Sequence, residues 1–181
     1  NVLKQANHDM KENEEFSQKA NNYMQLDEPY RGETKLLHYL EVLRDVVGFD
    51  EVAKRVKNPL TGKRIGAYYG CLLLRPGKVL QMDNPENPKI MEDLIRALGA
   101  EPVIYASRNE CCGGYVTMED KDLARKKSSA VMENAAEMKA DLLITACPLC
   151  LYNLTKNTPE ENRLPVLYFT ELLAEALGVK D

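Results

Sequence analysis

The five cysteines of this chain constrain its fold more than any other feature. Together they form the pattern C-x39-C-C-x34-C-x2-C, at Cys71, Cys111, Cys112, Cys147 and Cys150. They follow the ends of three segments that read as buried strands, over 64–71, 101–106 and 141–146. Because the carboxyl ends of parallel strands meet at one edge of a sheet, we expect the five thiols to converge there.

The alternation of elements beyond residue 63 predicts the fold class. Besides the three segments above, a short strand is expected over 166–169, and helices are expected over 88–98, 118–139, 149–156 and 170–177. The order β-α-β-α-β-α-β-α predicts an α/β fold of Rossmann or flavodoxin-like type, with a parallel sheet flanked by helices.

The first third of the chain has a different sequence pattern, without the alternation of strands and helices. Residues 1–57 read as helical, with apolar residues at helical spacing over 10–23, 36–47 and about 50–57. A proline- and glycine-containing turn over 58–62 ends this region. We therefore predict a helical N-terminal segment over 1–57 and a cysteine-bearing domain over 58–181. The chain begins with Asn1 and has no signal-peptide pattern, so we expect it to be a piece of a longer protein.

Charge and hydropathy exclude several classes of function. The 24 basic and 28 acidic residues give a net charge of −4, which argues against a nucleic-acid-binding surface. No apolar run approaches the roughly 18–20 residues that a membrane span requires. Without a secretion signal, the cysteines are expected to be reduced thiols in the cytoplasm rather than structural disulfides.

The number of cysteines limits what they hold. Cys147 and Cys150 alone fit either a thioredoxin-like redox pair or half of a zinc site. Zinc and a conventional cubane iron–sulfur cluster both use four ligands, so five thiolates exceed the need of each. We expect Gly70, Gly113 and Gly114 to let backbone N–H groups approach an anionic object, although turn formation alone also explains glycine there.

Other polar and aromatic residues near the cysteines are weaker candidates. Arg75 lies four residues past Cys71 and is a candidate to bind an anionic group of a substrate, or else is a surface arginine in a loop. His38 is expected to pack rather than to ligate a metal. The tyrosines near the strand ends are also expected to pack, either in the core or in the wall of the cysteine site: Tyr68, Tyr69 and Tyr105.

The cysteine motifs and their neighbours resemble a known family. The segments that carry the resemblance are Tyr69-Gly70-Cys71 with Arg75-Pro76, Cys111-Cys112-Gly113-Gly114, and Cys147-Pro148-Leu149-Cys150 with Asn153-Leu154. They resemble the cysteine-rich CCG domain, and more narrowly the second CCG domain in the B-type subunit of heterodisulfide reductase. The resemblance implies a first CCG domain upstream, which is absent from this sequence.

The resemblance also implies a cofactor and a reaction. The five cysteines would ligate a noncubane 4Fe–4S cluster, in an oxidoreductase that reduces a disulfide such as the coenzyme M–coenzyme B heterodisulfide of methanogenesis. Iron–sulfur or flavin-bearing redox subunits and a small-molecule disulfide are the implied partners.

Two alternative functions remain open at this point. The first is an electron-transfer subunit of a lactate, glycolate or succinate-type dehydrogenase, which uses the same ligands. The second is an interaction domain in which zinc contributes folding energy only.

Overall fold

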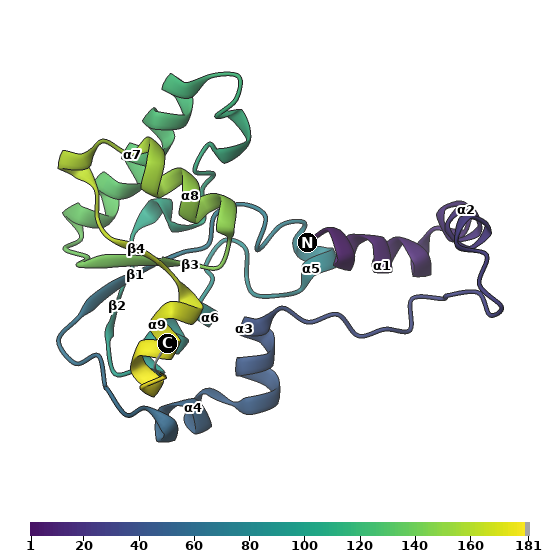
Figure 1. Ribbon diagram of the computed structural model, residues 1–181, viewed down its shortest axis with the longest axis horizontal. Coiled ribbons are helices and arrows are strands. Elements are labelled where there is room, and N and C mark those ends of the chain that lie inside the picture. The colour runs from purple at the N-terminus through teal and green to yellow at the C-terminus, as the bar shows by residue number, and fades with distance from the viewer. Residues whose placement is uncertain (180–181) are drawn as a thin grey trace.

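The chain folds around a parallel sheet of four strands, as the alternating pattern predicts. The computed structural model describes residues 1–179, so residues 180 and 181 of the predicted 58–181 domain lie outside the described part. The strand order is β2-β1-β3-β4, and all three pairings are parallel (Figure 1). The strands are β1 (Arg64–Tyr68), β2 (Glu101–Val103), β3 (Leu142–Thr145) and β4 (Val166–Tyr168).

The central strands are apolar because helices cover both of their faces. Ile65 and Ile144 are fully buried on the face that packs against α6 (Ile90–Ala97) and α9 (Phe169–Leu177). Leu143 is buried on the other face, towards α7 (Lys121–Glu137) and α8 (Pro148–Asn157). These helices lie on opposite sides of the sheet in Figure 1. Gly66 lets β1 and β3 pair closely, since a Cβ there would lie 2.5 Å from Leu143 Cδ2.

Two of the predicted strands end earlier than their sequences suggested. The strand predicted over 64–71 ends at Tyr68, and the one predicted over 101–106 ends at Val103. The N–H groups of Tyr69 and Gly70 leave the ladder and donate to the carbonyl of Arg108, at 2.7 and 3.3 Å. Short helices that the sequence did not predict occupy the loops: α5 (Gly77–Leu80), η2 (Ala106–Asn109), η3 (Gly114–Val116) and η4 (Glu160–Asn162).

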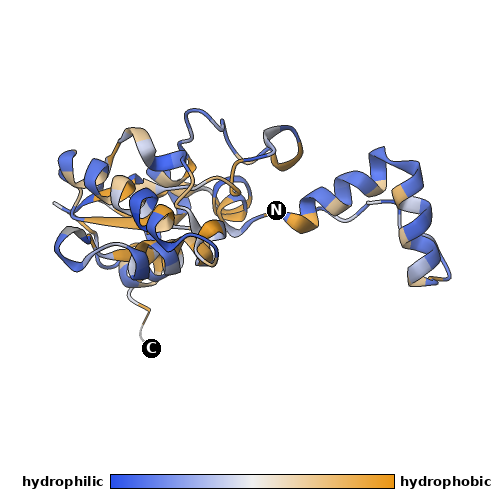
Figure 2. Ribbon diagram, turned by 90° about the horizontal axis from the view of Figure 1, so that it is seen from above, coloured by the Kyte–Doolittle hydropathy of each residue, from blue (hydrophilic) through white to orange (hydrophobic). Residues whose placement is uncertain are grey.

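The first two helices form an arm that projects from the α/β body (Figure 1). They are α1 (Val2–Glu12) and α2 (Glu14–Met24), and an extended segment over residues 26–38 leads back. The helix predicted over 10–23 is broken at Asn13, whose extended backbone ends α1 and whose side chain accepts a hydrogen bond from Phe16 N. The arm is mostly hydrophilic, in contrast to the apolar strands of the body (Figure 2).

The helices that follow the arm pack on the body. They are α3 (Tyr39–Glu41), the π-helix η1 (Val42–Val47) and α4 (Phe49–Arg55), and they bury Leu40, Leu43 and Val52 in the core. The helix predicted over 36–47 begins late because the His38 side chain caps it, accepting from Leu40 N at 3.1 Å. Packing of His38 is confirmed, since its ring lies 6.0 Å from that of Phe169. The predicted domain division at residue 58 stays a prediction.

Among the helices within residues 1–179, none is both long enough and apolar enough to cross a bilayer.

Candidate metal centre

All five cysteines line one cavity of about 60 Å³ at the carboxyl edge of the sheet. Cys71 follows β1, Cys111 and Cys112 follow β2, and Cys147 and Cys150 follow β3. Since β1 lies between β2 and β3, the three loops are neighbours in space although they are far apart in sequence. The fold therefore brings together the five residues that the sequence singled out.

The five sulfurs are free thiols at different depths. Cys112 and Cys150 are buried, with their Sγ atoms 3.6 Å apart, and the other three are partly exposed. In the part of the chain that the structure describes, no group of three or more His, Cys, Asp or Glu side chains is placed to hold a metal ion. The thiols instead line the walls of a shared cavity, and thiolate donors are those that iron–sulfur clusters and zinc take.

The closeness of the thiols makes their pKa values unequal. The hydrogen bond with the Cys150 thiol lowers the pKa of Cys112 to about 6, and another with the same thiol lowers the pKa of Cys147 to about 6. These two bonds raise the pKa of Cys150 itself. Burial, and after it Cys111, raises the pKa of Cys71 to about 11. The single proton of the Cys150 thiol serves one of these two bonds at a time, so the set favours a thiolate, the form in which cysteine binds metals, at Cys112 or at Cys147.

Glycines are required beside the thiols for space as well as for backbone conformation. Gly70 has φ +63°, and a Cβ there would lie 3.0 Å from Cys150 Sγ. Gly113 has φ +83°, and its Cβ would lie 3.0 Å from Ala124 Cα. At Gly114 a Cβ would meet Leu149 Cγ at 3.0 Å. The N–H groups of these glycines were expected to approach an anionic group. Of the three, the N–H of Gly113 donates to Cys111 Sγ at 3.4 Å.

Gly70→Ala is expected to reduce the metal content of the chain, because the new methyl group displaces Cys150 Sγ. Gly62→Ala is the matched control, since Gly62 has φ +81° but a Cβ there meets nothing within 4 Å. Both variants should lose about 1–2 kcal/mol of stability through left-handed backbone strain. Iron analysis after reconstitution, with thermal unfolding alongside, checks this. Equal iron contents in the two variants would show that the contact with Cys150 is unimportant.

Asn153 supports the site although sequence analysis assigned it no role. It lies on α8 one turn after Cys150, is buried, and donates through its amide to the carbonyl of Cys112. The hydroxyl of Thr117 donates to Asn153 Oδ1 at 3.0 Å. The i, i+3 spacing from Cys150 was the available signal, because residues so spaced share a helix face.

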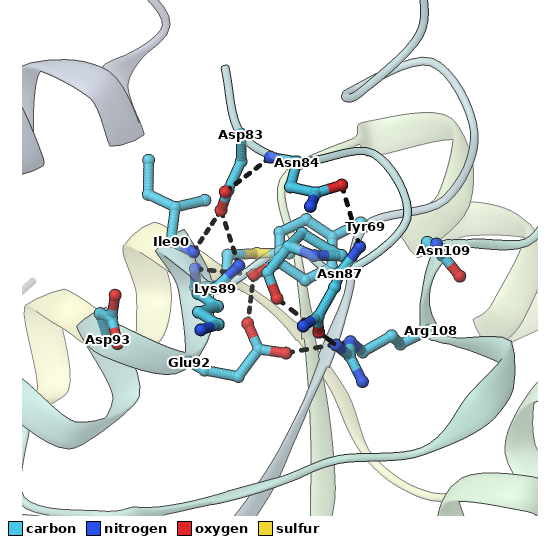
Figure 3. A network of polar contacts seen from close by, with 12 residues as sticks. Tyr69, Asp83, Asn84, Asn87, Lys89, Ile90, Glu92, Asp93, Arg108 and Asn109 are labelled. Carbon is cyan, nitrogen blue, oxygen red and sulfur yellow. Dashed lines mark hydrogen bonds and ion pairs between the residues drawn. The ribbon is translucent and has the colours of Figure 1, made fainter. Parts of the chain in front are cut away.

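A buried polar network includes Tyr69, which lies two residues before Cys71 (Figure 3). Tyr69 donates its hydroxyl proton to Glu92, and the Nε of Arg108 lies 3.3 Å from Glu92 Oε1. Arg108 also donates to Asn87 Oδ1 at 2.7 Å. Burial raises the pKa of Glu92, and the hydrogen bond from Tyr69 and the charge of Arg108 oppose that rise. The network joins the loops that contain Tyr69, Asn87 and Arg108 to the first turn of α6.

The network holds the cysteine loops through the backbone of Arg108. Its carbonyl accepts from the N–H groups of Tyr69 and Gly70, which ties the Cys71 loop to the one before Cys111. Asp83 similarly anchors the start of α6, accepting from the N–H groups of Lys89 and Ile90 at 2.6 and 2.7 Å (Figure 3). Arg108 was not predicted because its partners come from other loops, and Asp83 was not predicted because the N–H groups that it accepts from lie six and seven residues further along the chain.

The remaining candidates are placed as follows. The Arg75 guanidinium donates to Glu86 Oε1 at 2.9 Å and to the Asn109 carbonyl at 3.2 Å, and Arg75 is not among the residues that line the cavity. Its role in substrate binding stays a prediction. The tyrosines near the strand ends are buried, as predicted, and Tyr69 forms part of the cavity wall: Tyr68, Tyr69 and Tyr105.

Comparison with known families gives a match that covers the site. The family described as CCG, cysteine-rich domain, matches residues 65–155. This range contains all five cysteines, the glycines beside them, and Asn153.

Three curated relatives are similar to most of the chain. The 8-methylmenaquinol:fumarate reductase membrane anchor subunit of Wolinella succinogenes is 33% identical over 157 residues, which are 83% of this chain and 55% of that protein. A protein of Archaeoglobus profundus, named for its likeness to the B-type subunit of heterodisulfide reductase, is 32% identical over 188 residues, 97% of this chain and 63% of that protein. The B-type subunit of the ferredoxin:CoB-CoM heterodisulfide reductase of Methanosarcina mazei is 26% identical over 186 residues, 97% of this chain and 62% of that protein.

The chain is therefore shorter than these relatives. It spans 55 to 63% of their lengths. The relatives from Wolinella and Methanosarcina are each named as one subunit of a reductase.

Proposed function

The chain belongs to the family of cysteine-rich CCG domains, and from that premise we propose that it is part of an oxidoreductase that reduces a disulfide at an iron–sulfur centre. The observation that supports this most is the gathering of five free thiols around one cavity. Its relatives include the B-type subunit of a CoB-CoM heterodisulfide reductase.

The residues of the site fit an iron–sulfur cluster by their chemistry. Five cysteines lie in the cavity wall, one more than the four ligands of a cubane. Following what the resemblance to the CCG family implies, we assign them to a noncubane 4Fe–4S cluster, with Cys71, Cys111, Cys112, Cys147 and Cys150 as ligands. When bound, such a cluster supplies electrons one at a time to the sulfur of a bound substrate. Gly70 and Gly114 keep side chains away from Cys150 and Cys112, leaving room for the group.

The proposed reaction needs a source of electrons and protons. The disulfide R–S–S–R′ takes up two electrons and two protons, its sulfur–sulfur bond breaks, and two thiols leave. The electrons come from an iron–sulfur or flavin-bearing subunit docked beside the chain. The apolar walls of the cavity, which include Tyr69 and Leu149, limit the access of water to the reacting sulfur. A cytoplasmic location stays a prediction.

A second function has its own support. The relative from Wolinella is named as a subunit of a methylmenaquinol:fumarate reductase, so an electron-transfer role within a dehydrogenase or reductase would use the same five cysteines. In that case the centre passes electrons between partners and binds no thiol.

Iron and acid-labile sulfide per chain after anaerobic reconstitution test the proposal. About four of each are expected for a 4Fe–4S cluster. An electron paramagnetic resonance signal that shifts when a thiol is added would support disulfide reduction. Iron and sulfide without a thiol response would favour electron transfer, and one zinc without sulfide would replace both with a structural site.

A further inference from the structure

The mouth of the cysteine cavity is apolar. Leu72, Tyr115 and Leu149 line the cavity and are 39%, 69% and 37% exposed, so their carbon surface faces any molecule that reaches the thiols. Among the residues that line it, none is Lys, Arg, His, Asp or Glu. Apart from the thiols, the site offers carbon surface and the rings of two tyrosines, Tyr69 and Tyr115.

The arginines in the neighbouring loops are engaged elsewhere. Arg75 binds the Glu86 carboxylate and backbone carbonyls, and it is not among the residues that line the cavity. Arg108 is buried beside Glu92 and donates to Asn87. Neither guanidinium is placed to receive an anionic group of a molecule bound at the thiols.

We propose that this cavity selects thiols and disulfides whose group next to the sulfur is uncharged and apolar, either aliphatic or aromatic. The proposal deepens the proposed function and rests on it, because it names the substrate class of the same site. A carboxylate, sulfonate or phosphate that entered the cavity beside the thiols would lose water without gaining a charged partner, which is costly. An apolar group there covers the leucines and stacks on the ring of Tyr115.

Thiol–disulfide exchange on the metal-free chain tests this selectivity with two probes of the same shape. The uncharged probe is 2,2′-dithiodipyridine, and 6,6′-dithiodinicotinate is that molecule with a carboxylate on each ring. A cysteine thiolate attacks the probe, a mixed disulfide forms, and the aromatic thiolate leaves and is measured by its absorbance. Each rate is divided by the rate of the same probe with 2-mercaptoethanol, which removes the intrinsic reactivity of the probes.

The normalised rate is expected to favour the uncharged probe by about tenfold or more, as desolvation of an unpaired carboxylate requires. Tyr115→Arg should reduce that preference, because it places a cation at the mouth. Met118→Arg makes the same change in net charge three residues later, at a side chain that is 92% exposed and outside the lining, and should leave the preference unchanged. Equal shifts in the two variants would mean that net charge, not the cavity, sets the preference.

Other outcomes would overturn the proposal outright. These are equal normalised rates for both probes, no reaction of the chain with either, or a loss of rate confined to the carboxylated probe in Arg75→Met. The last result would mean that Arg75 binds anions at the site, as the sequence suggested.

A second measurement separates this proposal from the proposed function. The reconstituted chain is titrated with benzyl mercaptan and with 3-mercaptopropionate, and the resonance signal is followed. A lower half-saturating concentration of benzyl mercaptan is expected. Failure to incorporate iron and sulfide would remove the proposed function and leave the exchange result standing. A loaded cluster that binds the carboxylated thiol more tightly would remove the selectivity alone.

Discussion

Glu92→Ala is expected to lower the free energy of unfolding by about 3–5 kcal/mol, the usual cost of breaking a buried ion pair from one side. Glu92 is 1% exposed and Arg108 is 7% exposed, so the variant leaves a buried guanidinium without its carboxylate. It also removes the acceptor of the Tyr69 hydroxyl, which lies in the loop that leads to Cys71. Urea denaturation at neutral pH measures the change.

Glu86→Ala is the matched control for this prediction. Glu86 pairs with Arg75 at the surface, and such exposed pairs contribute about 0–1 kcal/mol. Tyr69→Phe should fall between the two variants, at about 1–3 kcal/mol, because it removes the hydroxyl that donates to Glu92 and accepts from the Met91 N–H, and leaves the ion pair. If Glu92→Ala and Glu86→Ala cost the same, the buried polar network does not stabilise the fold.

The pH dependence of stability gives this prediction a second check. Burial raises the pKa of Glu92 above its usual 4.5, so the folded chain holds that proton more tightly than the unfolded chain. The stability that comes from this proton is complete below pH 4.5 and is lost as pH rises through the raised value. Glu92→Gln should remove that part of the slope, as denaturation curves over this range would show.

Cys112→Ala and Cys150→Ala are each expected to reduce bound iron from about four per chain to less than one, since a cluster of this type needs its full ligand set. These two cysteines are the buried pair, with sulfurs 3.6 Å apart, at the point where the loops after β2 and β3 meet. Alanine is apolar and small, so the fold should survive the change. Iron and sulfide analysis after reconstitution measures the loss, and circular dichroism reports the fold.

Leu149→Ile is the control for the cysteine variants. It lies between Cys147 and Cys150 in the sequence and keeps the apolar character of the cavity wall. Its iron content should match that of the unaltered chain. Full iron in either alanine variant would remove that cysteine from the ligand set.

The sheet and the convergence of the thiols were predictable because they depend on local pattern and connectivity. Apolar segments that alternate with amphipathic helices specify parallel strands, and parallel strands bring their carboxyl ends together. Cys71, Cys111 and Cys150 needed no further information to be placed around one cavity. The break at Asn13 and the late helix start at His38 were missed because single side-chain caps, not periodicity, set them.

Side-chain partners were the part that the sequence did not reveal. Glu92 lies within the helix predicted over 88–98, and nothing nearby in the sequence identifies Arg108 as its partner. Arg75 is four residues from a cysteine, yet its guanidinium binds Glu86, in a loop that follows. Distance along the chain does not report the direction of a long side chain, which tertiary packing decides.

The order of the strands has a consequence for how the protein is made. The N–H of Arg64, the first residue of β1, donates to the carboxylate of Asp141, 77 positions later. The pairing of β1 with β3 can therefore form only after this later segment has left the ribosome. Parallel pairings over such separations form slowly. Cys71, Cys111 and Cys112 emerge before the strand that brings Cys147 and Cys150 to them. During that interval their thiols are open to oxygen and to wrong disulfides, so exclusion of oxygen during biosynthesis, before any purification step, should govern how many chains acquire iron.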